Sequence, residues 1–310
     1  DFQTATYMPE SSLLPYNGSA DLWTAEPYGT NFSLITNAVK VFNTLGTKPI
    51  WLAQNSIAAN LVVPKAYFAI ISGATGLHYF SWDSIKNQPD VLAAIEQVFS
   101  ELKGLNNAIF GSPMDSMVIA PTGIGTMSRF DPTTGTAYVL SVNPVATNVQ
   151  GNFTVQGLAA GQQITVLNEN RTITAGPGYF TDSFTGVSRH VYTIQGAPAG
   201  LTATVTGQTG LAGARDWAVQ VSNRGIGAAN AAQITSLTLS QTGGTACTPI
   251  VVPLTFPVTL GNLAPSQSAS GNVLINFTGC DSTSTFNAAL GLAANGGATM
   301  ATVVLNNEHM

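Results

Sequence analysis

Charged residues are scarce in this sequence. Only 8% of its 310 residues are Asp, Glu, Lys or Arg, against about 25% in an average soluble protein. Apolar residues keep an ordinary share of 45%, which excludes an intrinsically disordered chain, because disorder goes with few apolar residues and a high net charge. The net charge of −5 and the lack of basic runs argue against binding to nucleic acid. A polar but uncharged surface is typical of exported proteins, so we expect a secreted or cell-surface protein.

Long apolar runs are also missing. The most apolar stretch, residues 57–77, is interrupted by Asn60, Pro64, Lys65 and Ser72. A membrane-spanning helix needs about 20 predominantly apolar residues in a row. We therefore expect no membrane span.

Cysteine is limited to Cys247 and Cys280. A disulfide between them fits an exported protein and would close a loop of about 33 residues, adding about 3–4 kcal/mol on the chain-entropy model. Two buried free thiols are the alternative. The sequence has no cluster of His, Cys and carboxylates, no acidic calcium loop and no phosphate-binding glycine motif. We expect neither a metal nor a cofactor.

The first third of the chain alternates short apolar segments with helical patterns. Three segments predict buried strands: residues 20–26, 49–54 and 76–82. Three segments predict amphipathic helices between and after them: residues 31–46, 62–74 and 89–105. The second helix is expected to open near Pro64, because proline suits an early helical position. Strand–helix alternation predicts parallel strands joined by right-handed crossovers.

The rest of the chain changes to short β-rich segments punctuated by Gly, Pro and Asn. Residues 111–195 predict an antiparallel β-sandwich. A Gly- and Pro-containing linker at 195–200 then leads to residues 201–310, where about seven strands fit an immunoglobulin-like sandwich with Trp217 as its core aromatic residue. The predicted fold class is therefore multidomain, α/β plus all-β.

Three segments in order resemble the last part of a (β/α)8-barrel glycoside hydrolase. They are ADLWTAEPY, KPIWLAQN and ISGATGLHYFSWD, which are similar to strands six, seven and eight of such a barrel. Residues 111–195 resemble the small β-sandwich that follows many of these barrels, most specifically at Asp182, Phe184, His190 and Tyr192. The C-terminal region is similar to an immunoglobulin-type accessory module of exported bacterial proteins. The resemblance implies that residues 1–110 are the C-terminal part of a barrel.

The resembling barrel is too short to be complete. A (β/α)8 barrel needs about 250 residues, whereas the β-rich region here begins after residue 110. The chain also begins at Asp1 rather than Met. We expect the natural polypeptide to be longer, or another chain to supply the first half of the barrel.

The resemblance places the active site at the carboxyl ends of the barrel strands. The residues at these ends are, in chain order, Glu26, Tyr28, Gln54, Asn55, Trp82 and Asp83. Glycoside hydrolysis commonly uses two carboxylates that flank the scissile bond, and Glu26 and Asp83 are the two at these ends. They are the candidate catalytic pair, and the other four are candidate substrate-binding residues. Alternatively, Glu26 is a structural partner before a proline turn and Asp83 caps the turn that follows its strand.

Gln54 departs from the family pattern. In the large clan that the segments resemble, the nucleophile is a Glu at the end of strand seven, and Gln54 in the matching position does not ionise. The catalytic positions therefore differ, the barrel is non-catalytic, or the register is shifted. Aromatic faces stack on sugar rings, and Trp82 is the best placed to do so. Core packing is the expectation for Trp23 and Trp51.

The leading hypothesis is a secreted glycoside-hydrolase-like protein. It would cleave a polysaccharide or oligosaccharide by carboxylate acid/base chemistry, without a cofactor, and its partner would be carbohydrate. One rival is a non-catalytic carbohydrate-binding protein, in which Gln54 has replaced the catalytic Glu. Another is a structural surface or filament component whose β modules assemble.

Overall fold

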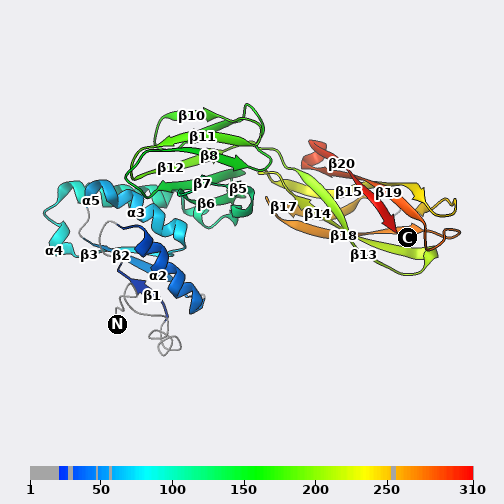
Figure 1. Cartoon of the computed structure of the whole chain (residues 1–310), viewed down its shortest axis with the longest axis horizontal. Coiled ribbons are helices and arrows are strands. Elements are labelled where there is room, and N and C mark those ends of the chain that lie inside the picture. The colour runs from blue at the N-terminus through cyan, green and yellow to red at the C-terminus, as the bar shows by residue number, and fades with distance from the viewer. Residues whose placement is uncertain (1–20, 27–30, 47, 56–57, 253–255, 310) are drawn as a thin grey trace.

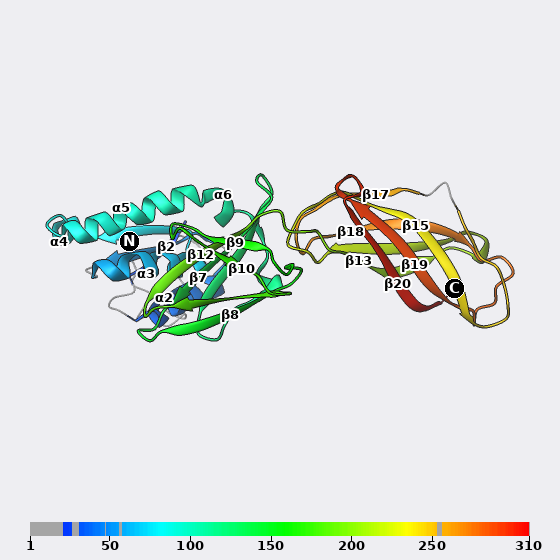
Figure 2. The ribbon, with the colours of Figure 1, turned by 90° about the horizontal axis from the view of Figure 1, so that it is seen from above.

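The helices come first in the chain and long antiparallel strands follow. The computed structural model describes residues 21–26, 31–46, 48–55, 58–252 and 256–309. Figure 1 shows an elongated molecule, with the helices at one end, strands β4–β12 beside them and strands β13–β20 at the other end. The view from above in Figure 2 gives the same order along the long axis.

A small parallel sheet lies at the N-terminal end. Its strands, in the order β1-β2-β3, are β1 (Trp23–Ala25), β2 (Ile50–Asn55) and β3 (Gly76–Phe80). The helices are α2 (Ser33–Thr44), α3 (Ala59–Ser72), α4 (Trp82–Ile85), α5 (Pro89–Gly104) and α6 (Asn106–Ile109). All three predicted strands and their parallel pairing are confirmed. None of the helices in the described ranges has the length and apolarity needed to cross a bilayer.

Helix α2 covers one face of this sheet through the apolar stripe seen in the sequence. Ile35, Val39 and Phe42 are buried on it. The ring of Phe42 stacks on the indole of Trp23 at 5.3 Å between centroids. The stripe predicts the helix correctly because residues three and four apart share a helix face.

The prediction of a partial (β/α)8 barrel is wrong. The parallel sheet has three strands in the described residues, and every other sheet there is antiparallel. Helix α3, which would lie between barrel strands and solvent, packs instead on strands β6, β7 and β12. Its residues Tyr67 and Ile70 share a core with Leu140, Val142 and Val191 of those strands. The chain therefore joins an open parallel sheet to an antiparallel one through α3.

Helix α3 also begins earlier than predicted. It starts at Ala59, five residues before Pro64, which lies inside it. The helix ends where Gly73 takes the left-handed conformation, with φ of 109°, and its N–H bonds to the last helical carbonyls.

Two antiparallel sheets form the middle of the molecule. The larger has the order β10-β9-β12-β7-β6-β4 and the smaller β11-β8-β5. The strands are β4 (Ser112–Pro113), β5 (Val118–Ile119), β6 (Gly125–Asp131), β7 (Thr136–Asn143), β8 (Val149–Val155), β9 (Gln163–Val166), β10 (Arg171–Thr174), β11 (Tyr179–Phe184) and β12 (Ser188–Ile194). Between the sheets lies an aromatic core of Phe130, Phe153, Phe180, Phe184 and Tyr192. We call β4–β12 the middle sandwich.

Two four-stranded antiparallel sheets form the C-terminal end. Their orders are β13-β14-β18-β16 and β17-β15-β19-β20. The strands are β13 (Leu201–Thr209), β14 (Arg215–Asn223), β15 (Ala229–Gly243), β16 (Ile250–Val251), β17 (Val258–Leu263), β18 (Ser268–Asn276), β19 (Thr285–Ala294) and β20 (Thr299–His309). The described residues thus give eight strands rather than about seven, because the two-residue β16 has no clear sequence pattern. We call β13–β20 the C-terminal sandwich.

The core of the C-terminal sandwich confirms two predictions. Trp217 is completely buried and packs near Phe277, with ring centroids 6.0 Å apart. Cys247 and Cys280 form a disulfide, with their Cα atoms 5.2 Å apart. The alternative of two free thiols is thereby excluded.

Candidate functional site

The carboxyl ends of the three parallel strands meet at one edge of the sheet. Glu26 directly follows β1, Gln54 and Asn55 end β2, and Trp82 and Asp83 open α4 just after β3. The ends are staggered, because β1 ends at the pair Ala25↔Leu52, whereas β2 and β3 continue three residues further to the pair Asn55↔Phe80. We call this the carboxyl edge. The structure therefore brings five of the six predicted site residues to one side of the sheet.

Three parts of the prediction lie outside what the structure describes. Tyr28 falls in the undescribed segment 27–30, and the side chains of Gln54 and Asn55 are not described either, although their backbones are. The geometry of the site accordingly rests on Glu26, Trp82 and Asp83.

The two carboxylates lie on either side of β2. Neighbouring strands are about 4.8 Å apart, so the backbones of β1 and β3 are separated by about 10 Å. Inverting glycosidases hold their carboxyl groups about 6.5–9.5 Å apart, and retaining ones about 5 Å. Glu26 and Asp83 are separated by this distance and also by the stagger of the strand ends, so their backbones lie farther apart than either spacing.

The surroundings of the two carboxylates differ. Glu26 is half-buried beside the buried Ala25. Asp83 is in the first turn of α4, its side chain is 84% exposed, and it accepts a 2.6 Å hydrogen bond from Lys86 Nζ. An exposed ion pair of this kind contributes little to stability, so Asp83 is not needed to hold the fold.

Two indoles in this part of the molecule are exposed. Trp82, at the start of α4, is 66% exposed at the carboxyl edge, and Trp51, near the amino end of β2, is 43% exposed. The expectation of core packing holds for Trp23, which is buried against α2, and is wrong for Trp51. Trp51 alternates with the buried Ile50 and Leu52, and therefore points away from α2.

The indole of Trp51 lies across the neighbouring strand. It pairs in register with Gly76 of β3, and a Cβ at Gly76 would come within 2.6 Å of the Trp51 Nε1 atom. Glycine at this position therefore gives the indole room to lie against the strand. Strand alternation together with a glycine in the next strand is the sequence signal that would have found Trp51.

A cluster of charges in the middle sandwich is a second candidate. Arg171 donates two hydrogen bonds to Asp182, at 2.9 and 2.7 Å, and one to Glu169 at 2.8 Å. Tyr192 donates to Asp182 at 2.9 Å, and His190 Nδ1 lies 2.5 Å from a Glu169 oxygen. Burial alone would raise the pKa of Asp182, but the hydrogen bonds from Arg171 and Tyr192 hold it below its ordinary value.

The same cluster reaches the helices. Arg189 of β12 bonds Glu101 of α5 at 2.5 Å, and Glu101 accepts a 2.7 Å hydrogen bond from Tyr67 of α3. The Arg189 guanidinium also lies over the Tyr67 ring, 5.3 Å from its centroid. Burial, reinforced by Glu101, raises the pKa of Tyr67 above its ordinary value. These charges are paired with one another, so the cluster joins the helices to the sandwich and is not an open site.

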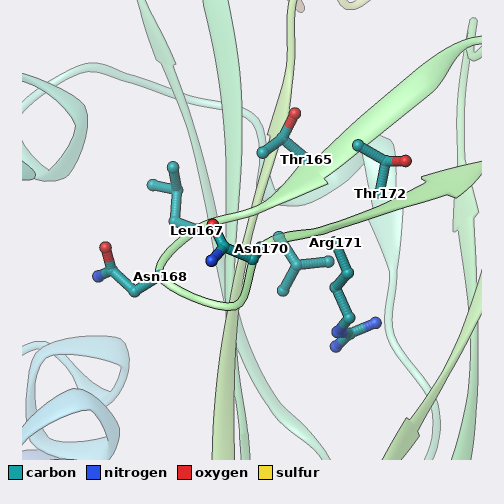
Figure 3. Close-up of a pocket in the computed structure, with 7 residues that line it drawn as sticks. Thr165, Leu167, Asn168, Asn170, Arg171 and Thr172 are labelled. Carbon is teal, nitrogen blue, oxygen red and sulfur yellow. The ribbon is translucent and has the colours of Figure 1, made fainter.

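A pocket of about 330 Å³ lies at the β9–β10 hairpin. Figure 3 shows its lining side chains spread along one hairpin, with Arg171 directed away from the turn that carries Asn168 and Asn170. The lining residues are Thr165, Val166, Leu167, Asn168, Asn170, Arg171 and Thr172. None of the predicted site residues lines this pocket. Across the described ranges, no group of three or more His, Cys, Asp and Glu side chains is placed to hold a metal ion.

Glycoside hydrolases are among the solved structures to which the chain is similar. No family model matches the sequence, and neither does any curated protein. The chain is similar to the solved structure of an α-amylase from Geobacillus thermoleovorans, with a TM-score of 0.40 at 7% identity over 61% of this chain and 58% of that one. It is also similar to CelM2, a bifunctional glucanase-xylanase from a metagenome library, with a TM-score of 0.39 at 12% identity over 61% and 47% of the two chains.

A GH30 endoxylanase from Clostridium papyrosolvens is similar as well, with a TM-score of 0.35 at 11% identity over 58% and 50% of the two chains. The chain thus spans about half the length of these enzymes. TM-scores below 0.5 do not establish a shared fold, so the function is argued from the residues of the chain itself.

Proposed function

We propose that this is a secreted, glycoside-hydrolase-like protein that binds carbohydrate at the carboxyl edge of its parallel sheet. The observation that carries the proposal is the solvent-exposed indole of Trp82, which begins α4 just after β3, next to the exposed carboxylate of Asp83. Indole faces stack on sugar rings, and the indole N–H donates to a hydroxyl. A single exposed large aromatic side chain is unremarkable, but an exposed indole next to an exposed carboxylate offers a sugar both a stacking surface and a hydrogen-bond acceptor.

Hydrolysis is the second candidate function, with Glu26 and Asp83 as its carboxylates at the strand ends. One carboxyl group would protonate the glycosidic oxygen and the other would activate water. The uncharged Gln54 lies one residue before the end of the strand between them, where an amide could donate to or accept from sugar hydroxyls. Asp83 would exchange its bond to Lys86 for contact with the substrate or water.

Two features support the proposal of export. The surface carries few charges, and the disulfide Cys247–Cys280 is of the kind that persists in oxidising compartments.

Binding is tested with a polysaccharide panel by affinity electrophoresis, followed by calorimetry on the best ligand. Trp82→Ala should weaken binding about tenfold, because an aromatic contact contributes about 1 kcal/mol beyond its buried area. The matched control is Phe110→Ala, which removes another exposed aromatic ring, just after α6. No binding to any polysaccharide, or equal losses in both variants, would contradict the proposal.

Hydrolysis is tested by the release of reducing sugar from the same panel. Glu26→Gln and Asp83→Asn should each abolish turnover while leaving binding within a few-fold of the unmodified protein. Turnover that persists in both variants would remove these residues from the mechanism. Binding without any turnover in the unmodified protein would leave carbohydrate binding as the function.

A further inference from the structure

Strand β20 forms one border of the C-terminal sandwich and is regular over its first seven residues, before a register shift near Asn307, whose φ is 56°. It is the outermost strand of the sheet β17-β15-β19-β20 and has eleven residues. From Thr299 to Leu305 it pairs with β19 without a register shift, and this stretch has no proline and no charged residue. In the part of the chain that the structure describes, no strand pairs with its outer side. Such an edge is a template for another strand, and natural proteins usually blunt it.

The other three edge strands of the same sandwich are short or irregular. Strand β13 has a register shift between Val205 and Gly207. Strand β16 has only two residues, and β17 pairs irregularly around Gly261, whose φ is 84°. Bulges and short strands are the devices that discourage pairing between edges. Among these four borders, β20 has the longest regular stretch, seven residues from Thr299 to Leu305, against five from Leu201 to Val205 in β13.

The side chains of β20 are apolar on both faces. On the outer face, Met300 is 75% exposed and Val304 53%, with Thr302 between them. On the inner face, Val303 and Leu305 pack against the core of the sandwich but stay only partly buried. Apolar surface is therefore left open on both faces of this edge.

We propose that β20 pairs antiparallel with β20 of a second copy of this chain. The two-fold axis that relates the copies passes midway between their two Thr302 residues. The sequence around Thr302 is complementary to itself. In this register Thr302 lies opposite its own counterpart, and Met300 lies opposite Val304 of the partner subunit. On the inner face, Ala301 lies opposite Val303 of the partner subunit. Both exposed apolar side chains are thereby covered, and no like charges meet.

The two-fold axis makes the contact isologous, so each copy offers the same edge and the assembly closes at two chains. The two four-stranded sheets become one eight-stranded sheet. A second copy is the proposed occupant because its own exposed apolar residues, Val304 and Met300, fall opposite Met300 and Val304 of the first. This inference does not depend on the proposed carbohydrate site.

The test is the mass of the purified chain in solution. Sedimentation equilibrium up to about 100 µM, a range that detects dissociation constants near the micromolar level, should give twice the 32.1 kDa of one chain. The double variant Met300→Lys with Val304→Lys places lysines opposite lysines and should raise the dissociation constant at least 100-fold. Leu211→Lys is the control, because it adds a lysine at another exposed apolar residue, between β13 and β14.

Charge reversal tests the pairing itself. Glutamate at both Met300 and Val304 should also give a monomer, and mixing this variant with the lysine variant should restore a dimer. A monomeric unmodified protein at the highest concentration would overturn the proposal. So would a lysine variant that dimerises as tightly as the unmodified protein.

A cysteine at the two-fold axis tests the register. Residues directly opposite in an antiparallel pair have Cα atoms about 4.5–5.5 Å apart, within reach of a disulfide. Thr302→Cys should therefore cross-link into dimers under mild oxidation, and Thr204→Cys, exposed on the bulged strand β13, should not. Both native cysteines are already bonded to each other. Equal cross-linking of the two variants, or a ladder of larger polymers, would overturn the closed two-fold pairing.

Discussion

The middle and C-terminal sandwiches are both built from two antiparallel sheets, but they are stabilised by different interactions. Both enclose a core rich in aromatic side chains between antiparallel sheets. The middle sandwich carries a network of partly buried ion pairs that reaches α3 and α5. The C-terminal sandwich has a disulfide, and residues 201–310 contain only five Asp, Glu, Lys and Arg residues. The difference shows that ion pairs are concentrated where a sheet must be joined to helices.

Both sandwiches contain a buried asparagine that is hydrogen-bonded to backbone carbonyls. A buried asparagine ends a central strand in each: Asn143 in β7 and Asn223 in β14. The Asn223 side chain donates to the carbonyls of Gly227 and Leu263, and Asn143 donates to two loop carbonyls in the same way. Buried amides pinned by several backbone groups fix the loops around a strand end. The sandwiches therefore share their internal construction and differ in how they are attached.

Truncation of a buried side chain in either core should show that the middle and C-terminal sandwiches unfold as separate units. Trp217→Ala and Phe153→Ala each remove a completely buried ring and should cost about 4 kcal/mol. Calorimetry should show two unfolding transitions, with Trp217→Ala lowering one and Phe153→Ala lowering the other. If each variant lowers both transitions equally, the predicted boundary near residue 200 does not separate independent units.

Removal of the disulfide should affect the C-terminal sandwich alone. Replacement of Cys247 and Cys280 by Ser should destabilise the transition that contains Trp217 by about 3–4 kcal/mol, because a crosslink restricts the unfolded chain. Calorimetry of this double variant checks it, with the other transition as the internal control. A matching loss in the middle sandwich would mean that the two sandwiches stabilise each other.

Disruption of the ion-pair network should affect the middle sandwich alone. Asp182→Asn leaves the Arg171 guanidinium without its two-pronged partner and should cost about 3 kcal/mol. Urea unfolding followed at the middle transition measures this cost. Asp90→Asn, at an exposed position in α5, is the matched control and should have a much smaller effect.

The same ion-pair network makes the stability of the middle sandwich depend on pH. The pKa of Asp182 is lowered in the folded protein, so its stabilisation is present above the unfolded value near 4 and is lost as the pH falls further. The pKa of Tyr192 is raised, by burial and then by Asp182, so its stabilisation is lost as the pH rises above about 10. The melting temperature of the middle transition should therefore fall at both extremes. Asp182→Asn should flatten the acid side, and an unchanged acid slope would contradict this assignment.

Local sequence patterns predicted the helices and strands of the first third of the chain. They did not predict that the parallel sheet is an open one of three strands in the described residues. The stripe Ile35, Val39 and Phe42 predicted α2, because it reports which face of a helix is apolar. The barrel prediction failed because three strand-like segments do not specify what lies beyond them. The second face of α3 packs on strands that begin more than 50 residues later in the chain. Tertiary partners at that distance leave no periodic signal in either segment.

The candidate site shows the same limit. The grouping of Glu26 with Trp82 and Asp83 could be predicted, because the carboxyl ends of parallel strands share an edge. The exposure of Trp51 was missed, although its alternation with buried neighbours was visible. The pairing of Glu101 with Arg189 joins residues 88 positions apart and could not be read from either one.

The smallest expected effect separates structural carboxylates from the one at the carboxyl edge. Asp83→Asn should change the free energy of unfolding by less than about 0.5 kcal/mol, because an exposed ion pair on one helical turn is worth little. Glu101→Gln, whose side chain is only 8% exposed, removes the charge that pairs with Arg189 and should cost about 3 kcal/mol. Urea unfolding of both variants measures the contrast. Equal losses would make Asp83 a structural residue, whereas the expected difference means that any loss of turnover in Asp83→Asn reflects chemistry at the edge and not damage to the fold.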